Sequence, residues 1–415
     1  MKINLDRVLL ILLCLMPISI MIGKAALNLN LFFFDLLVIF LLFQKKIFAD
    51  IKISKNLILA FIFLLIIIIN VFLSVKINLS SLALLGLVKN LIFCLGLSLF
   101  IKFEDLKKYF SLIVFISLIF VSINVLLQFF LGTDMFGNSY VGQIRSSAVF
   151  GDQIPGSYIL KFLFVCLLFT LFKKNLLLNF VYLSFFSMII IITNERMPAL
   201  NILFFSILFI SIFPQENLRK KVITIISYLI LCFLFFNIPI PNDFQKDNKV
   251  NIYDHLTART KLQFQRQTAK DNFYSIYWIQ HFRAATEIFI DKPVIGSGLK
   301  TYRYFCPIKQ NEKNKDNQLV CSLHPHNLYF EIASETGILG LVFFIFYLST
   351  LIIKLILNYI KYEKNRYETL IVFLPLLLLF NPFQITGSIF STYSGFFYFM
   401  VIGVGINFLK NNSIK

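Results

Sequence analysis

The four histidines of this chain are the side chains best suited by type to acid–base chemistry. They are His255, His281, His324 and His326, and all lie in one polar stretch or at its end. Histidine titrates near neutral pH and can accept a proton from a hydroxyl group. A single histidine is more often a solvated or hydrogen-bonded surface residue, so location alone does not select among the four.

The segment from Cys321 to Gly340 singles out His326. It reads CSLHPHNLYFEIASETGILG, so a polar His-Pro-His-Asn sequence leads into a long apolar run. Pro325 is well placed for a helix N-terminus, where free N–H groups and the helix dipole attract phosphate and disfavour protonated histidine. A neutral His326 there would be a competent general base. Gly337 and Gly340 would let a neighbouring helix approach closely.

The elements that must position this segment are runs of apolar residues. Hydrophobic residues make up 58% of the 415 residues and charged residues 14%, against about 25% charged residues in soluble domains. This composition argues against a soluble enzyme, and the net charge of +18 reflects membrane topology rather than nucleic-acid binding. We expect an all-α polytopic membrane protein with about twelve transmembrane helices. The expected spans are 8–23, 29–44, 57–75, 81–101, 111–132, 155–172, 175–193, 198–213, 222–240, 328–353, 368–384 and 393–409.

Lysine and arginine are concentrated in alternate loops between these runs. With the N-terminus inside, twenty basic residues fall on the inner side and four in the short outer loops. Cytoplasmic loops carry such an excess, so both termini are expected in the cytoplasm. The first run lacks a small-residue cleavage site and is expected to be a retained span. The chain then divides into 1–240 with nine spans, a large outer loop at 241–325, and 326–415 with the motif helix and the last three spans.

The large outer loop is rich in aromatic residues and is expected to be ordered, against the alternative of a flexible basic loop. In the stretch 271–290, Phe273, Ile276, Phe282 and Phe289 could line one face of a helix. We expect that helix to lie against the membrane.

Two of the six cysteines, Cys306 and Cys321, lie in this loop. In an oxidising compartment they are expected to form a disulfide, which would contribute about 3 kcal/mol in the chain-entropy view. The other four lie within spans, where cysteine is usually a small hydrophobe. No metal-ligand spacing accompanies the pair, so a zinc site is not expected.

At this point the sequence resembles a known family. His326 and Asn327, followed after nine residues by Gly337-x-x-Gly340, fit the pattern of the O-antigen ligase and O-antigen polymerase superfamily of bacterial membrane glycosyltransferases. Those proteins are similar in fold to other lipid-linked (GT-C type) glycosyltransferases, with about twelve helices and a large periplasmic loop before the motif helix. The resemblance covers the topology of the whole chain, and its specific residues lie mainly in 278–340.

Three further segments resemble parts of this family. Residues 282–298, FRAATEIFIDKPVIGSG, resemble the stretch upstream of the histidine. Residues 145–152, RSSAVFGD, resemble the outer loop after the fifth span. Residues 194–198, NERMP, correspond to a loop that usually holds an essential arginine, here Arg196, although they depart from the commoner Ser-Arg-Gly form.

The resemblance implies transfer of a glycan from an undecaprenyl-pyrophosphate-linked donor to a sugar hydroxyl at the periplasmic face of the bacterial inner membrane. His326 would take the proton of the attacking hydroxyl. Arg145, Arg196 and Arg283 would stabilise the departing pyrophosphate, and Asn327 would contribute to substrate binding. Because the outer loop has no Asp-x-Asp sequence, arginine and the helix dipole would replace a divalent metal. No cofactor is expected.

These assignments have alternatives. Arg145 and Arg196 could anchor lipid headgroups instead. His324 is expected to be structural, because Asn327 directly follows His326 in the family pattern. Other arginines compete with Arg283 for the pyrophosphate: Arg259, Arg266 and Arg303.

Three charged residues, Asp35, Lys89 and Lys161, lie within predicted spans. Each costs about 2.5–3.5 kcal/mol at mid-bilayer on insertion scales. We expect them to pair inside the bundle or reach toward its ends rather than to bind substrate.

The leading function is that of an O-antigen ligase, whose acceptor is lipid A–core or another glycan. An O-antigen polymerase, joining lipid-linked repeat units, comes second, and a protein O-oligosaccharyltransferase third. A twelve-span transporter is a further class, but such folds usually show two related halves and polar residues at the midplane. A receptor that uses the loop for binding is the last. The expected partners are the lipid-linked donor, the acceptor and membrane lipids, with no nucleic acid.

Overall fold

The computed structural model describes residues 5–44, 55–140, 145–151, 154–168, 175–214, 216–239, 251–254, 257, 277–311 and 321–412. Regular structure in these ranges is helical, and extended pairing is limited to isolated bridges such as that between Thr133 and Ser139. The expected all-helical fold class is confirmed for this part of the chain.

Each apolar run predicted from the sequence coincides with a helix. These helices are α1 (Leu5–Ile22), α2 (Lys24–Gln44), α4 (Lys55–Phe72), α5 (Ile77–Leu99), α7 (Ser111–Leu131), α8 (Pro155–Cys166), α9 (Leu176–Ile192), α10 (Arg196–Ser211), α11 (Leu218–Phe236), α15 (Leu328–Lys361), α16 (Arg366–Leu379) and α17 (Thr392–Asn412). Between them lie α6 (Phe103–Asp105), η1 (Leu106–Phe110), η2 (Ala148–Phe150), α13 (Tyr277–Asp291), α14 (Tyr302–Asn311) and η7 (Glu363–Asn365).

Six of the described helical segments are long and apolar enough to cross a membrane, namely α1, α2, α5, the continuous stretch Phe103–Leu131, α15 and α17. Shorter apolar helices include Ile62–Phe72, α8, α9 and α10. The chain is therefore a polytopic membrane protein. The count of twelve spans, the division of the chain and the periplasmic location of 241–325 stay predictions.

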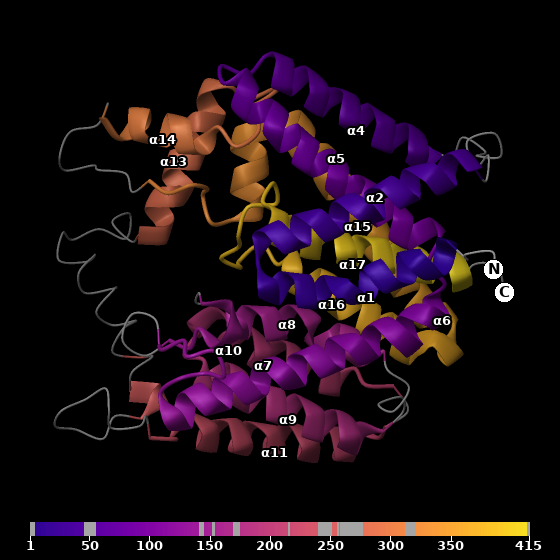
Figure 1. Cartoon of the computed structure of the whole chain (residues 1–415), viewed down its shortest axis with the longest axis vertical. Helices are drawn as coiled ribbons and strands as arrows, with labels where there is room; N and C mark the ends of the chain where they lie inside the picture. The colour runs from indigo at the N-terminus through magenta and orange to yellow at the C-terminus, as the bar shows by residue number, and fades with distance from the viewer. Residues whose placement is uncertain are drawn as a thin grey trace.

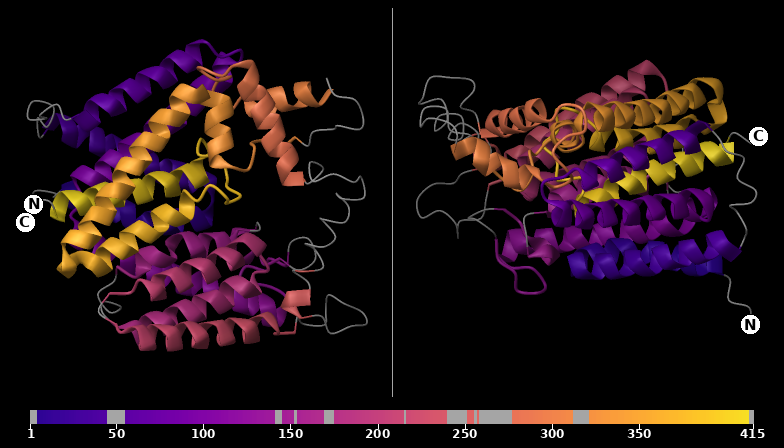
Figure 2. Two further views of the ribbon diagram at one scale, coloured as in Figure 1. Left: turned by 180° about the vertical axis from the view of Figure 1, so that it is seen from behind. Right: turned by 90° about the horizontal axis from the view of Figure 1, so that it is seen from above.

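The long helices run back and forth between two ends of the molecule. Both termini lie at one end, and α13 and α14 lie at the other (Figures 1 and 2). Among the described segments, the one around α6, which carries Lys102, Lys107 and Lys108 of the basic excess, lies at the end with the termini (Figure 1). The predicted topology requires the termini at one end of the helices and the long outer loop at the other, and the termini, α13 and α14 are placed in this way (Figures 1 and 2). Which side of the membrane each end faces stays a prediction.

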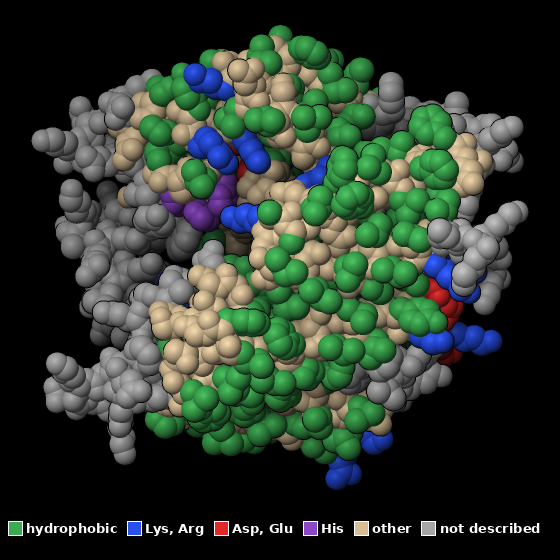
Figure 3. Space-filling model, in the orientation of Figure 1, with side chains coloured by type: hydrophobic (Ala, Val, Ile, Leu, Met, Phe, Trp, Pro, Cys, Tyr) green, Lys and Arg blue, Asp and Glu red, His purple; other side chains and the backbone are tan. Residues whose placement is uncertain are grey.

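The helices show one face to the interior and another to the surroundings. On α2, Leu31, Phe34 and Val38 are buried, whereas Phe40 and Phe43 are exposed. Apolar side chains cover much of the outside of the helical body in the same way (Figure 3). Large exposed apolar surface is costly in water and normal for helices in lipid.

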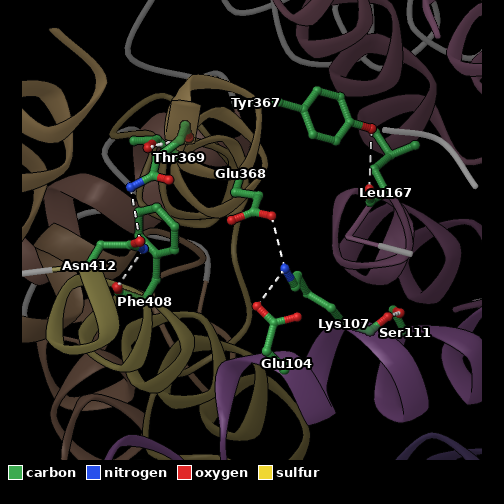
Figure 4. Close-up of polar contacts among 10 residues, drawn as sticks. Glu104, Lys107, Ser111, Leu167, Tyr367, Glu368, Thr369, Phe408 and Asn412 are labelled. Carbon is green, nitrogen blue, oxygen red and sulfur yellow. Dashed lines mark hydrogen bonds and ion pairs between the residues drawn. The ribbon is translucent and has the colours of Figure 1, made fainter. Parts of the chain in front are cut away.

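An ion-pair network joins two helical segments at the end with the termini (Figure 4). The ammonium group of Lys107 lies 2.8 Å from the Glu104 carboxylate and 3.0 Å from that of Glu368 on α16. Next to it, the Tyr367 hydroxyl donates to the Leu167 carbonyl oxygen at 3.2 Å. These contacts fix the start of α16 against η1 and against the end of α8. The connection that follows α16 reaches the histidine segment.

Candidate functional site

Asn327 fixes the start of α15. Its side-chain oxygen accepts hydrogen bonds from the backbone N–H groups of Tyr329 (3.0 Å) and Phe330 (3.3 Å). This is an N-cap, and it satisfies donors that the first helical turn leaves open. The side-chain N–H of Asn327 donates to the carbonyl oxygen of Pro382 at 2.7 Å. Asn327 therefore ties the start of α15 to the connection between α16 and α17.

His326 occupies the left-handed backbone region, with φ of 58°. Few residues other than glycine adopt this conformation, and it costs free energy that surrounding contacts must offset. One such contact is the backbone N–H of Thr386, which donates to the carbonyl oxygen of His326 at 2.8 Å.

Three histidines gather at this point. The ring centroid of His326 lies 4.3 Å from that of His324 and 5.2 Å from that of His281 on α13. His281 Nδ1 lies 3.3 Å from the Tyr302 hydroxyl, and His324 Nε2 lies 3.2 Å from the Thr386 carbonyl oxygen. Histidine side chains are visible as one patch, beside lysine and arginine side chains, on the face shown in Figure 3. The fourth, His255, falls outside the described residues.

The cluster favours neutral imidazoles. Burial, and secondarily the neighbouring His324 and His281, lower the pKa of His326 to about 3. Burial also lowers the pKa of His324, an effect that Arg303 reinforces and the Thr386 carbonyl opposes. His326 is therefore uncharged at neutral pH and has a ring nitrogen able to accept a proton.

The helix α15 is broken at Gly337, whose φ of 68° and ψ of −171° are not helical. The turn at 293–296 fits into the break, because Ile338 N–H donates to the Pro293 carbonyl (2.8 Å) and Leu339 N–H to that of Val294 (3.3 Å). The element that approaches Gly337 is thus this turn, where the sequence analysis expected a neighbouring helix. A Cβ added at Gly340 would meet the side chain of Thr336 on the same helix, so its nearest contact is not with a neighbouring helix.

Two buried glutamates on α15 hold the surrounding segments. The Glu335 carboxylate accepts from the backbone N–H groups of Lys300 (2.6 Å) and Tyr302 (3.2 Å). The Glu331 carboxylate accepts from the backbone N–H of Ile389 at 3.1 Å. The sequence analysis gave these residues no role. The sequence did contain a signal for their importance, because two carboxylates four residues apart on an apolar helix share one face.

The helices α13 and α14 pack on the motif segment. The Phe282 ring stacks on that of Phe330 with centroids 4.8 Å apart, and a disulfide joins Cys306 to Cys321 with their Cα atoms 5.7 Å apart. The buried face of α13 consists of His281, Ala284, Ala285 and Ile288. Its small residues let α13 lie close to α14 and α15, while Phe282 and Phe289 of the face expected to lie against the membrane are half-buried. Whether α13 lies against the membrane stays a prediction. Phe273 and Ile276 of the expected face lie outside the described residues.

The segments that carry Arg145 and Arg196 meet near a buried carboxylate, that of Glu195. The Ser146 N–H donates to the Thr193 carbonyl at 3.2 Å, which brings the Arg145 segment to the start of α10. Burial raises the pKa of Glu195 to about 7, against the opposing effects of Arg145 and of hydrogen bonds from Gly156 (2.6 Å) and Ser157 (3.2 Å). The charge of Arg145 thus acts on the residue that directly precedes Arg196.

Arg283 lies on a different element from these two, α13, which packs on α14 and α15. Arg303 on α14 is close enough to His324 and Glu331 to act on both electrostatically. The sequence analysis ranked Arg303 behind Arg283, whereas the structure places both next to the motif helix. The other two competitors, Arg259 and Arg266, fall outside the described residues. The predicted arginines are therefore divided between two groups of elements.

Comparison with protein families gives a match over part of the chain. Residues 178–345 match the model of a family described as O-antigen ligase. The matched range runs from α9 into α15 and contains Arg196, Arg283, His326 and both motif glycines. No curated protein matches the chain.

Proposed function

We propose that this chain, which carries a domain of the O-antigen ligase family at residues 178–345, is an O-antigen ligase of the bacterial inner membrane. It moves a glycan from undecaprenyl pyrophosphate to a sugar hydroxyl of lipid A–core at the periplasmic face. The observation that carries the proposal is the position of His326 directly before the capped start of α15, with its ring packed against those of two further histidines and its pKa lowered by burial. Both termini are then cytoplasmic.

The transfer makes two chemical demands. The acceptor hydroxyl must lose its proton as its oxygen bonds to the donor sugar, and His326 accepts that proton. The bond between the sugar and the pyrophosphate breaks, and the pyrophosphate leaves with the electron pair. Its growing charge is stabilised by the N-terminus of α15, by Arg283 and by Arg303. Arg145 and Arg196 bind the donor, Asn327 holds the helix start, and no divalent metal takes part.

Deletion of the gene distinguishes the ligase from its relatives. We expect a deletion strain to lose all long glycan on its lipopolysaccharide while keeping an intact core, because the last transfer is missing. Gel electrophoresis of the lipopolysaccharide measures this, with the wild-type gene supplied on a plasmid as the control. Core that still carries a single repeat unit would contradict the ligase and indicate the polymerase. Unchanged lipopolysaccharide would favour a protein glycosyltransferase or a transporter.

The pH dependence of the reaction follows from the histidine cluster. In the free protein the pKa of His326 is about 3, so kcat/KM should keep its value down to acidic pH. A bound pyrophosphate places negative charge beside the ring, favours the protonated form and raises its pKa. We therefore expect the acid limb of kcat to lie at a higher pH than that of kcat/KM.

Initial rates of the purified protein with a lipid-linked donor, measured from pH 4 to pH 8, give both profiles. Proton transfer is most effective when the pKa of the base lies near the working pH, so the donor itself would bring His326 toward that value. Coincident acid limbs near pH 6.5 would instead indicate an ordinary solvated histidine and would argue against the proposed base.

A further inference from the structure

A cavity of about 310 Å³ lies beside the histidine segment, between α2, α5, the turn before α14 and the start of α17. None of its lining residues is among those proposed to bind the lipid-linked donor or to act as the base. Its polar lining consists of Asn28, Lys89, Asn90, Lys300, Ser391 and Thr392.

The lining of the cavity is positively charged. Lys89 and Lys300 lie close enough for their charges to repel each other, and no carboxylate lines the cavity within the described residues. Asp35 acts on Lys89 from outside the lining, and Glu331 and Glu335 act on Lys300 in the same way. Two cations kept together against their mutual repulsion suit a ligand with more than one negative charge.

The ammonium group of Lys89 and the backbone of Lys300 are held in place. The Lys89 ammonium donates to the Asn28 side-chain oxygen at 2.5 Å, and the Thr392 hydroxyl donates to the same oxygen at 3.1 Å. Lys300 has a left-handed backbone, with φ of 57°, and the Glu335 carboxylate accepts from its N–H at 2.6 Å. A site assembled in advance loses less entropy when a ligand binds.

Asn90 supplies a second sign of an absent ligand. The residue is 1% exposed, and its side-chain oxygen has no hydrogen-bond partner among the described residues. Buried polar atoms are rarely left in this state without a ligand or water to serve them. A hydroxyl or a protonated phosphate oxygen in the cavity would satisfy it.

One wall of the cavity faces the surrounding lipid. Leu82 and Leu85 line it and are 69% and 66% exposed on the apolar helix α5. A molecule with a charged headgroup and apolar tails could enter from this side, with its tails remaining against α5. Lysine within a span is costly, which a function for Lys89 would explain.

The cavity is joined to the histidine segment by a short stretch of chain. Thr386 N–H donates to the carbonyl oxygen of His326 at 2.8 Å, and the Glu331 carboxylate accepts from Ile389 N–H at 3.1 Å. Ser391 and Thr392, which follow directly, line the cavity. A headgroup bound there would therefore lie next to the elements that position the proposed base.

We infer that this cavity binds the phosphate-bearing headgroup of a membrane lipid through Lys89 and Lys300. It forms a second anion site, separate from Arg145 and Arg196. The inference deepens the proposed function, because lipid-linked pyrophosphate is the proposed donor, but binding itself requires no glycan transfer. Lysine is a strong point-charge ligand for phosphate.

The test compares Lys89→Met with Lys300→Met and the double variant. Methionine keeps the length of the side chain and removes the charge, and it leaves the left-handed backbone at Lys300 no more strained than lysine does. Loss of one charged hydrogen bond is worth about tenfold in affinity, so we expect about tenfold weaker binding for each variant and about a hundredfold for both. Lys24→Met is the matched control, since Lys24 is an exposed lysine of α2 outside the cavity.

Binding is measured on the full chain in nanodiscs that contain undecaprenyl pyrophosphate or phosphatidylglycerol, and with inorganic pyrophosphate alone. Weakened binding of undecaprenyl pyrophosphate only would identify the donor lipid, and equal weakening with phosphatidylglycerol would identify a general anionic-lipid site. Arginine at both positions keeps the charge, so that variant should bind lipid like the wild type, which would attribute the loss in the methionine variants to the missing charge. Unchanged lipid binding in the double variant, or an effect on free pyrophosphate alone, would overturn the inference. A chain that binds lipid but transfers no glycan would refute the proposed function and leave the site intact.

Discussion

His326→Asn should reduce glycan transfer by about 10²–10⁴-fold, the range that proton transfer by a positioned group usually contributes. Asparagine tolerates the left-handed backbone that His326 adopts, so the chain should fold and insert at wild-type yield. It cannot accept a proton from the acceptor hydroxyl. The loss would then be chemical, whereas alanine at this position would also disturb the backbone.

His324→Asn is the matched control. Its ring lies 4.3 Å from that of His326, and its Nε2 is engaged with the Thr386 carbonyl at 3.2 Å. A structural histidine should cost far less, and mainly in thermal stability. Transfer of a radiolabelled glycan in membrane vesicles gives the rates, and size-exclusion profiles show that each variant is folded. Near wild-type transfer by His326→Asn, or equal losses in the two variants, would remove His326 as the base.

The helices could be predicted from the sequence because their signal is local. An apolar run such as 328–353 is long enough to span a bilayer whatever its neighbours are, and it coincides with α15. The sequence also predicted a helix start near Pro325, and α15 begins three residues later at Leu328, after its N-cap Asn327. The count of spans is less secure from the same signal, since α8 to α10 are shorter than a typical span.

The parts that could not be predicted depend on contacts between distant residues. Asn70 on α4 donates to the carbonyls of Ile295 (2.6 Å) and Glu335 (2.8 Å), more than two hundred residues away in the chain. The buried face of α13 likewise depends on which helices it meets. The separation of Arg283 from Arg145 and Arg196 has the same origin, because sequence places all three in outer segments without saying which segments touch.

Gly337→Ala should cause the largest loss of stability of any single methyl group added to the motif. The φ and ψ at Gly337 fall in a region that glycine alone adopts readily. A Cβ there would lie 2.3 Å from the Val294 carbonyl oxygen and 2.7 Å from the Gly296 nitrogen. Both are backbone atoms of the turn that fits into the break of α15, so neither can move without displacing that turn. We expect a cost of about 3 kcal/mol or more, combining backbone strain with the steric clash.

Release of the turn at 293–296 should also affect the proposed site. The turn leads from α13 to α14, and α13 places His281 5.2 Å from His326, so expelling the turn should loosen the histidine cluster as well. Thermal unfolding in detergent gives the stability, and hydrogen exchange of 277–302 shows whether the turn has been released. Gly405→Ala is the control, because its Cβ would meet Leu351 at an ordinary 3.5 Å within the regular helix α17, and it should change stability by no more than about 0.5 kcal/mol. If both variants melt alike and exchange alike, the break at Gly337 does not hold the turn, and the positioning of His281 must come from the contacts of α13 alone.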